Sequence, residues 1–323
     1  MTHFKSGVND INRGKSDKMY IGILVYPGVM RSALYGIEEM LRVAVERHGA
    51  AITSVIQVLP EALPDCPFHL LLIPPSIEPS PPLPSAVLLS WLRAQHREGC
   101  ILASACAGIF ILAPTGLLDG KTATTHWLLT ERCKREFPAV NFQPERLLID
   151  EGDIVTAGGV SAWMDLTLAL IGRFFGSATA TALGKYFLLD AGSRQQSYFS
   201  CFIPILDHKD GLVLAVQYKL EQYFALPLSV ATMAAWVYVS PRTLQRRFQA
   251  ATGESPIRYL QKLRLSKAQE KLENSQLSLE EIVIDIGYED LSAFRRLFRQ
   301  QYGLSPSKYR QRFSFPQTKT RSE

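Results

Sequence analysis

The feature that most constrains the fold is an internal repeat near the C-terminus. Residues 229–260 are SVATMAAWVYVSPRTLQRRFQAATGESPIRYL, and residues 278–310 are SLEEIVIDIGYEDLSAFRRLFRQQYGLSPSKYR. Five pairs match at an offset of 50, namely Arg246 with Arg296, Phe248 with Phe298, Gly253 with Gly303, Pro256 with Pro306 and Tyr259 with Tyr309. Ser229 matches Ser278 at an offset of 49, so the length difference falls in the turn between helices. The repeat indicates one supersecondary unit used twice.

Each copy has the pattern of two helices joined by a tight turn. In the second copy, the first helix carries apolar residues at helical spacing, Gly287 ends it and Asp290 caps the next helix. In the first copy, Ser240 and Pro241 form a favourable helix start. The residues predicted to face inward are Leu244, Phe248, Phe294, Leu297 and Phe298.

The side chains left on the outer face of each second helix suit DNA. Arginine can donate two hydrogen bonds to guanine, glutamine can bond adenine, and both can bond phosphates. A helix-turn-helix presents the start of its second helix to the major groove. The candidate DNA-binding residues are Arg242, Gln245, Arg246, Ser292, Arg295, Arg296 and Arg299. A helical protein-interaction domain with surface arginines is the alternative interpretation.

The charge of the chain is concentrated in the same region. From Leu212 to the end there are 17 Lys+Arg and 10 Asp+Glu, which gives +7. The preceding residues hold the other 18 Lys+Arg and 20 Asp+Glu, which gives −2. A basic C-terminal third behind a near-neutral body is typical of a polyanion-binding module attached to another domain.

The first two-thirds of the chain alternates short apolar runs with amphipathic segments. MYIGILVYPG (19–28), FHLLLIPP and CILASA are typical of buried strands, and ALYGIEEMLRVAVERHG and SAWMDLTLALIGRFFG are typical of helices. Such alternation predicts an α/β fold, a doubly wound parallel sheet covered on both faces. LLIDEGDIVTAGG predicts a late strand pair, and the proline-rich stretch 74–85 predicts a surface loop.

A cysteine lies where a site is expected in this fold. Cys106, within ASACAGIF, follows a predicted strand and precedes a predicted helix. Ligands bind at the carboxyl ends of strands in such sheets, and N–H groups that open a helix are expected to lower the pKa of a thiol. The order of elements over residues 19–190 resembles the class I glutamine-amidotransferase-like superfamily, which includes the PfpI protease. The matching stretches are SACAG, GLLDGKTATTHW with His126, and TAGGVSAWMDL.

Compared with that superfamily, the residues needed for catalysis are depleted. Ala33 stands where enzymatic members carry an acid, and Ala107 stands where protease-like members carry histidine. Pro75 and Ser76 match the Gly-Gly that donates to the oxyanion, and proline has no N–H. We therefore expect no catalytic residue, and a small polar effector bound by Cys106, Ala107, Ser76 and His126.

Residues from about 221 to 313 resemble the DNA-binding domain of the AraC/XylS family of transcriptional regulators. The stretch YEDLSAFRRLFRQQYGLSPSKYR falls at the signature of that family. The resemblance implies two recognition helices, which read successive major-groove segments. Tyr238 departs from the pattern, because the family usually has glycine in this turn.

The predicted organisation is therefore a tail (1–18), an amidotransferase-like α/β domain (19–190), a linker (191–211), a double helix-turn-helix domain (212–316) and a second tail (317–323). Neither a signal peptide nor a membrane span is recognisable, so we expect a cytoplasmic protein. Five scattered cysteines without a CxxC pair favour neither disulfides nor a metal site, and no cofactor is expected.

The sequence predicts a transcriptional regulator that binds double-stranded DNA. The α/β domain is expected to sense a small-molecule effector, or oxidation of Cys106, and to form homodimers, with RNA polymerase as a further candidate partner. The alternative is a cysteine-dependent hydrolase or lyase fused to a DNA-binding module, in which Cys106→Ser would abolish turnover. A pure interaction scaffold would show no salt-dependent affinity for DNA.

Overall fold

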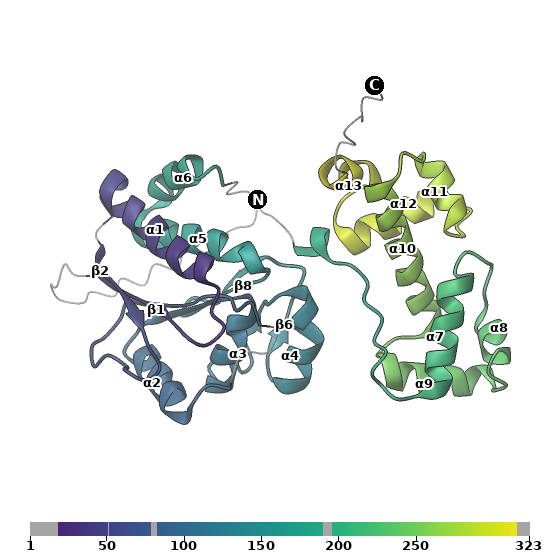
Figure 1. Ribbon diagram of the computed structural model, residues 1–323, viewed down its shortest axis with the longest axis horizontal. Coiled ribbons are helices and arrows are strands. Elements are labelled where there is room, and N and C mark those ends of the chain that lie inside the picture. The colour runs from purple at the N-terminus through teal and green to yellow at the C-terminus, as the bar shows by residue number, and fades with distance from the viewer. Residues whose placement is uncertain (1–18, 51, 79–82, 190–195, 315–323) are drawn as a thin grey trace, which may run out of the picture. The chain divides into compact units, whose positions relative to one another are not determined.

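The chain forms two compact units that divide between Gln196 and Ser197. The computed structural model describes residues 19–50, 52–78, 83–189 and 196–314. Figure 1 shows an α/β unit followed by an all-helical unit. The two predicted tails, 1–18 and 317–323, and residues 191–195 of the predicted linker lie outside the described residues.

The α/β unit is built on a sheet of six strands in the order β2-β1-β3-β4-β8-β7. Neighbouring strands are parallel, except that β7 is antiparallel to β8. The strands are β1 (Met19–Leu24), β2 (Ile52–Val58), β3 (Leu70–Ile73), β4 (Ile101–Ala105), β7 (Leu148–Asp150) and β8 (Ile154–Ala157). Because β3 and β8 are buried along their whole length, their sequences are continuous apolar or small runs. The predicted sheet and its late strand pair are confirmed.

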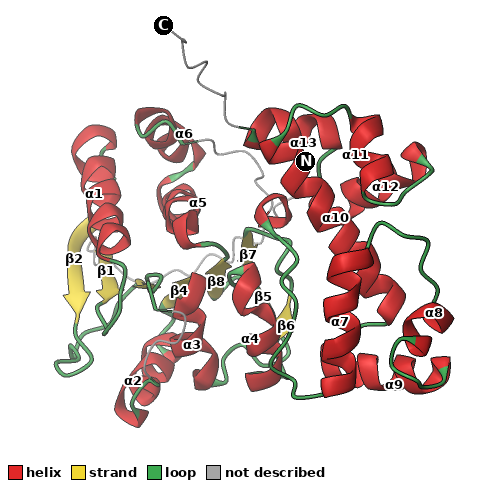
Figure 2. Ribbon diagram, turned by 45° about the vertical axis from the view of Figure 1, so that its right-hand side comes forward, coloured by secondary structure: helices red, strands yellow, loops and turns green. Residues whose placement is uncertain are grey.

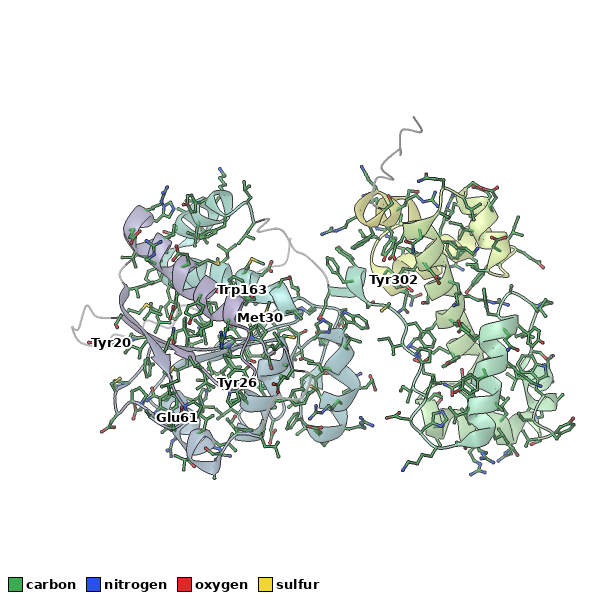
Figure 3. The ribbon with its side chains drawn as sticks, viewed as in Figure 1. Tyr20, Tyr26, Met30, Glu61, Trp163 and Tyr302 are labelled. Atoms are coloured by element: carbon green, nitrogen blue, oxygen red, sulfur yellow. The ribbon has the colours of Figure 1, made fainter. Side chains whose placement is uncertain are left out.

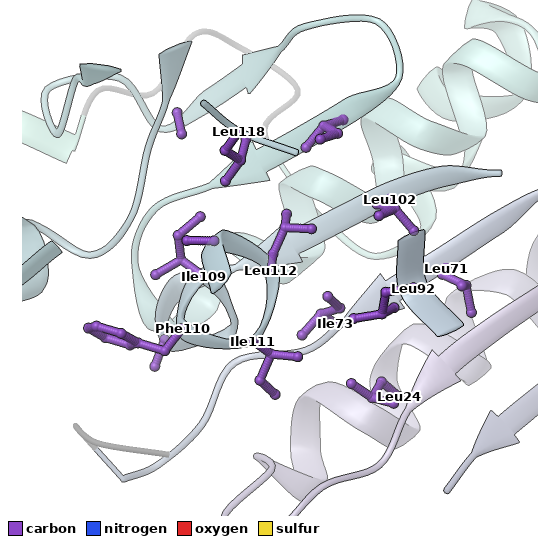
Figure 4. Close-up of a cluster of buried hydrophobic side chains, with 14 of the residues drawn as sticks. Leu24, Leu71, Ile73, Leu92, Leu102, Ile109, Phe110, Ile111, Leu112 and Leu118 are labelled. Carbon is purple, nitrogen blue, oxygen red and sulfur yellow. The ribbon is translucent and has the colours of Figure 1, made fainter. Parts of the chain in front are cut away.

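Helices cover both faces of this sheet, as Figure 2 shows. One face packs against α1 (Arg31–His48), α5 (Trp163–Phe175) and α6 (Ser177–Tyr186). The other packs against α2 (Ala86–Arg97), α3 (Ile109–Leu112) and α4 (Thr130–Glu136). Figure 4 shows side chains of α3 and of the sheet, among them Ile73 and Leu102, in one buried cluster. A short parallel pair, β5 (Thr122–Ala123) and β6 (Asn141–Phe142), completes the unit.

The carboxyl ends of β1, β3 and β4 converge on one edge of the α/β unit. Cys106 follows β4 directly. The loops after β1 and β3 are hydrogen-bonded to each other, because Met30 N donates to Pro75 O at 2.8 Å and Ile77 N donates to Gly28 O at 3.0 Å. The loops after β1 and β3 therefore border the region around Cys106.

The helical unit contains the predicted repeat. Helices α8 (Val230–Ala235) and α9 (Pro241–Thr252) form the first copy, and α11 (Leu279–Asp285) and α12 (Leu291–Tyr302) form the second. The long helix α10 (Pro256–Asn274) joins the copies, while α7 (Gly211–Tyr223) precedes them and α13 (Pro306–Phe313) follows. Each copy has its own hydrophobic cluster.

Residues 197–210 pack against this helical unit. Gln269 of α10 donates to Ser200 O at 3.1 Å, and the ring of Phe202 meets that of Tyr259 edge-on with centroids 4.9 Å apart. Gln217 donates to Ile205 O at 2.9 Å. The segment therefore touches both α7 and α10. No helix among the described residues of the chain is long and apolar enough to cross a membrane.

Candidate nucleic-acid interface and elbow site

The first helix-turn-helix exposes its predicted DNA-binding residues. Ser240 caps α9 by accepting a hydrogen bond from Thr243 N at 3.2 Å, and Pro241 opens the helix. Leu244 and Phe248 are fully buried against the core, as predicted. This anchoring leaves Arg242, Gln245 and Arg246 exposed on the opposite face of α9.

The second copy repeats the arrangement. Asp290 caps α12 by accepting hydrogen bonds from Ser292 N at 2.7 Å and Ala293 N at 2.9 Å. These bonds and the charge of Arg296 lower the pKa of Asp290. Phe294 and Phe298 are fully buried. The four predicted residues on this helix are all exposed: Ser292, Arg295, Arg296 and Arg299.

The two turns differ in a way that explains the departure from glycine. Gly287 has a φ of +78°, and a Cβ there would lie 2.2 Å from the carbonyl oxygen of Ala225. Tyr238, in the first copy, also has a positive φ of 56°, but its side chain is 97% exposed. Only the second turn is crossed by another backbone segment, so only there does a side chain find no room.

A groove of about 620 Å³ lies beside the second recognition helix. It is lined by Arg295, Arg296, Arg299 and Gln300 of α12 and by the start of α13, residues 305–307. Sequence reasoning missed Gln300, Ser305 and Ser307. The signal available was the repeated Ser-Pro at 255–256 and 305–306, which starts a helix next to each recognition helix.

Not every arginine of the recognition helices is available to a ligand. Arg247 of α9 makes a two-pronged contact with Asp210, from Nε at 2.9 Å and from Nη2 at 2.6 Å. The same Asp210 caps α7 by accepting from the backbone of Val213 at 3.1 Å. Arg247 therefore holds α9 to α7 through Asp210.

Cys106 begins the turn between β4 and α3, residues 106–108, which we call the elbow. Its backbone there is strained. Cys106 has a φ of 53°, and its side chain is only 4% exposed. Burial raises the pKa of the Cys106 thiol to about 11, and this outweighs the opposite effect of a hydrogen bond from the backbone of Ala107. The expectation that opening N–H groups would lower this pKa is therefore wrong, because desolvation is the larger effect.

The polar side chains next to the elbow already form hydrogen bonds within the protein. Thr125 Oγ1 donates to the carbonyl of Cys106 at 2.9 Å, and the hydroxyl of Tyr26 donates to Pro74 O at 2.6 Å. Figure 3 marks Tyr26 beyond the end of β1. Burial raises the pKa of Tyr26, and a negative charge on Cys106 would add to this effect. Ala107 is 1% exposed, so the elbow is closed to solvent.

The other two candidate effector residues have structural partners. Ser76 Oγ donates to Gly28 O at 2.8 Å and accepts from Glu78 N at 2.9 Å. His126 Nδ1 accepts from Leu128 N at 3.2 Å, and burial lowers the pKa of this imidazole. Within the described residues, His126 forms no hydrogen bond with Cys106. The structure therefore gathers Cys106, Ala107 and Ser76 in buried positions around one sheet edge, and leaves His126 half-buried.

The acidic residues after the first strand do not serve the elbow. Glu38 accepts a hydrogen bond from Gln57 at 2.7 Å, and Glu39 pairs with Arg42 at 2.5 Å. Ala33, which stands at the expected acid position, is fully buried. No cluster of three or more metal-ligating side chains occurs in the part of the chain that the structure describes.

Sequence reasoning missed Gln196, which fastens the end of the α/β unit. Its amide donates to Thr125 O at 2.9 Å and Pro144 O at 2.8 Å and accepts from Trp127 N at 2.9 Å. A Cβ on Gly158 would lie 2.2 Å from Gln196 Nε2, so glycine makes room for this side chain. Gln196 lies inside the predicted linker, where no periodicity marks it.

Two family models match the chain, one in each unit. A DJ-1/PfpI family model matches residues 42–173, and a helix-turn-helix domain model matches residues 233–312. A solved structure of a putative transcriptional regulator from Vibrio parahaemolyticus is 21% identical, with a TM-score of 0.48, and covers 53% of this chain and 99% of its own.

Curated relatives have the corresponding names. The chain is 32% identical to the HTH-type transcriptional regulator GbdR of Pseudomonas aeruginosa over 69% of its own length and 61% of GbdR. The match thus spans about three-fifths of GbdR. It is 31% identical to the HTH-type transcriptional regulator GlxA of Rhizobium meliloti over 68% of each chain. This chain belongs to the AraC/XylS family of helix-turn-helix regulators, in the group whose members carry a DJ-1/PfpI-type α/β domain.

Proposed function

We propose that this protein is a sequence-specific regulator of transcription that binds double-stranded DNA in the cytoplasm. The observation that carries the proposal is the pair of capped recognition helices, each of which buries its aromatic face and leaves a polar, cationic face exposed. Arg242, Gln245 and Arg246 of α9 and Ser292, Arg295 and Arg296 of α12 are the residues we assign to the major groove. The names of GbdR and GlxA support the same function.

The test measures binding of the full chain to labelled duplexes by fluorescence anisotropy. The probes are a mixed-sequence duplex and a duplex recovered by in vitro selection with the unaltered protein. We expect Arg246→Ala and Arg296→Ala each to weaken binding to the selected duplex by about 5- to 150-fold, which is the range for loss of a two-pronged base contact. Arg97→Ala, at an exposed position at the end of α2, is the matched control.

The α/β unit is proposed to sense a small-molecule effector without catalysis and to pair the chains as homodimers. A neutral, buried thiol supports the absence of catalysis, because the thiolate is the nucleophile. Since Cys106, Ala107 and Ser76 are covered, an effector would have to displace the hydrogen-bonded loops after β1 and β3. A thermal-shift screen of the full chain against small metabolites tests sensing, and sedimentation tests the dimer.

A cysteine-dependent hydrolase or lyase is the second candidate, and the positive φ at Cys106 is the observation that favours it. The two proposals differ at Cys106→Ser. A sensor is expected to change effector response or DNA binding and to show no turnover in either form. Measurable turnover by the unaltered protein that is lost in the variant would establish the enzyme.

A further inference from the structure

The groove between α12 and α13 has the chemistry of a polyanion site. Three guanidinium groups, from Arg295, Arg296 and Arg299, share it with the serines at the start of α13. Guanidinium groups bond phosphate oxygens through paired N–H donors, and serine hydroxyls add single donors.

The first copy of the repeat does not provide the same chemistry. At an offset of 50, Arg295 corresponds to Gln245, Arg299 to Gln249 and Ser307 to Ile257. The side chain of Gln249 is already engaged, since Nε2 donates to Gly253 O at 2.6 Å. Ile257 is 42% exposed and offers no polar atom. The equivalent position beside α9 therefore retains one arginine, Arg246, in place of three.

Arg299 is the arginine of the groove that is most available to a ligand. Arg295 lies 3.8 Å from Glu280, and the charge of Arg296 acts on Asp290. Arg299 is exposed and forms no ion pair with any other described residue. Its charge is therefore the least compensated of the three.

The position of Arg299 along α12 favours phosphates over bases. Helix-turn-helix proteins contact base edges with the first residues of the recognition helix. Arg299 lies two turns beyond Ser292, about 10 Å farther along the axis at 1.5 Å per residue. At that distance from the helix start, a long cationic side chain meets the sugar-phosphate backbone.

We propose that the groove formed by Arg299, Ser305 and Ser307 holds a phosphodiester segment of the DNA backbone. The second helix-turn-helix then supplies more of the salt-dependent, sequence-independent part of the binding free energy. The first contributes mainly through base contacts. This inference rests on the proposed DNA-binding function, and it assigns Arg299, which is outside the set proposed for the major groove, to the DNA backbone.

The test exchanges residues between the two copies. Affinities of the full chain for the mixed-sequence and the selected duplex are measured from 50 to 200 mM KCl, and the slope of log Kd against log salt is compared. Each phosphate contact contributes about 0.9 to this slope. We expect Arg299→Gln to lower the slope by about 1 on both duplexes, so that the affinity lost across this salt range shrinks about fourfold.

Two further variants and a control sharpen the outcome. Gln249→Arg, which gives the first copy the residue of the second, is expected to raise the slope. Ser307→Ile is expected to weaken binding to both duplexes by the same factor, since a backbone contact carries no sequence information. Arg97→Gln, on the surface of the α/β unit, is expected to leave slope and affinity unchanged.

The outcomes distinguish a failure of the groove proposal from a failure of the proposed DNA-binding function. If the unaltered protein binds neither duplex at 50 mM KCl, the proposed function fails. If it binds both, and Arg299→Gln weakens only the selected duplex with the slope unchanged, Arg299 reads a base and the groove proposal is overturned. A slope unaffected by Arg299→Gln, together with affinities unaffected by Ser307→Ile, also overturns it.

Discussion

Single residues decide how each turn of the repeat is built. Gly287 and Tyr238 both adopt a positive φ, yet the carbonyl of Ala225 leaves no room for a side chain only at Gly287. Residues in this backbone region cost about 1–2 kcal/mol when they carry a Cβ. The first copy accepts that cost at Tyr238, whereas the second would face a steric clash in addition.

The first prediction concerns this clash. Gly287→Ala is expected to destabilise the helical unit by about 3 kcal/mol, the sum of backbone strain and overpacking. Gly253→Ala is the matched control, because Gly253 has a φ of +76° with open space around it, and should cost about 1 kcal/mol. Urea unfolding measures both. Equal losses would show that the contact with Ala225 does not constrain the turn.

The second prediction concerns the elbow thiol. With a pKa of about 11, Cys106 carries about one thiolate in a thousand molecules at pH 8. Its raised pKa stabilises the folded state below the ordinary thiol pKa of 9.0, and this contribution is lost as the pH rises from 9 toward 11. Iodoacetamide at pH 8 is expected to modify exposed Cys201 at least about tenfold faster than Cys106, as mass spectrometry would show. Preferential labelling of Cys106 would support the enzyme instead.

At the scale of elements, one carboxylate links two helices of the first copy. Asp210 caps α7 and also binds Arg247 of α9, so the recognition helix is fixed to the helix that precedes the repeat. The hydrogen bonds from Arg247 hold the pKa of Asp210 below its ordinary value. The orientation of α9 thus depends on a contact between residues far apart in the sequence.

The third prediction follows from this double role. Asp210→Ala is expected to destabilise the helical unit by about 1–2 kcal/mol, as loss of a helix N-cap does. Arg247→Met should cost less, because the cap survives. Since the pKa of Asp210 is lowered, the contribution is present above pH 3.8 and is lost as the pH falls further. Urea titrations from pH 7 down to pH 2 measure it, and an Asp210→Ala loss that does not shrink as the pH falls below 3.8 would contradict the assignment.

At the scale of the whole molecule, each unit has its own hydrophobic clusters. Two clusters line the two faces of the sheet, and two others fill the two copies of the repeat. The buried amide of Gln196, the last residue of the α/β unit, bonds Thr125 O and Pro144 O. Residues 197–210, which follow it, contact the helical unit. The units are therefore expected to unfold as separate cooperative transitions.

The fourth prediction tests that independence. Gln196→Ala removes the partners of Thr125 O, Pro144 O and Trp127 N, and leaving buried polar groups unpaired should destabilise the α/β unit by about 2–4 kcal/mol. The transition of the helical unit is expected not to move. Calorimetry of the full chain measures both transitions, with Gln222→Ala on the exposed side of α7 as the control. A shift of both transitions together would show that the units unfold as one.

The sequence by itself determined the elements, their caps and the repeat. These depend on apolar periodicity and on residues within one turn of each other, such as Ser240 with Thr243 and Asp290 with Ala293. The exposed faces of α9 and α12 followed for the same reason, because helical spacing alone separates Phe248 and Phe298 from the arginines beside them.

Tertiary structure alone decided the rest. The carbonyl of Ala225 that crosses Gly287 and the amide of Gln196 that bonds Thr125 O and Pro144 O both join segments that are far apart along the chain. The direction of the Cys106 pKa also depended on packing, because desolvation reflects how completely the thiol is covered. Local patterns specify which elements form, whereas close approach and burial depend on three-dimensional neighbours that no local pattern encodes.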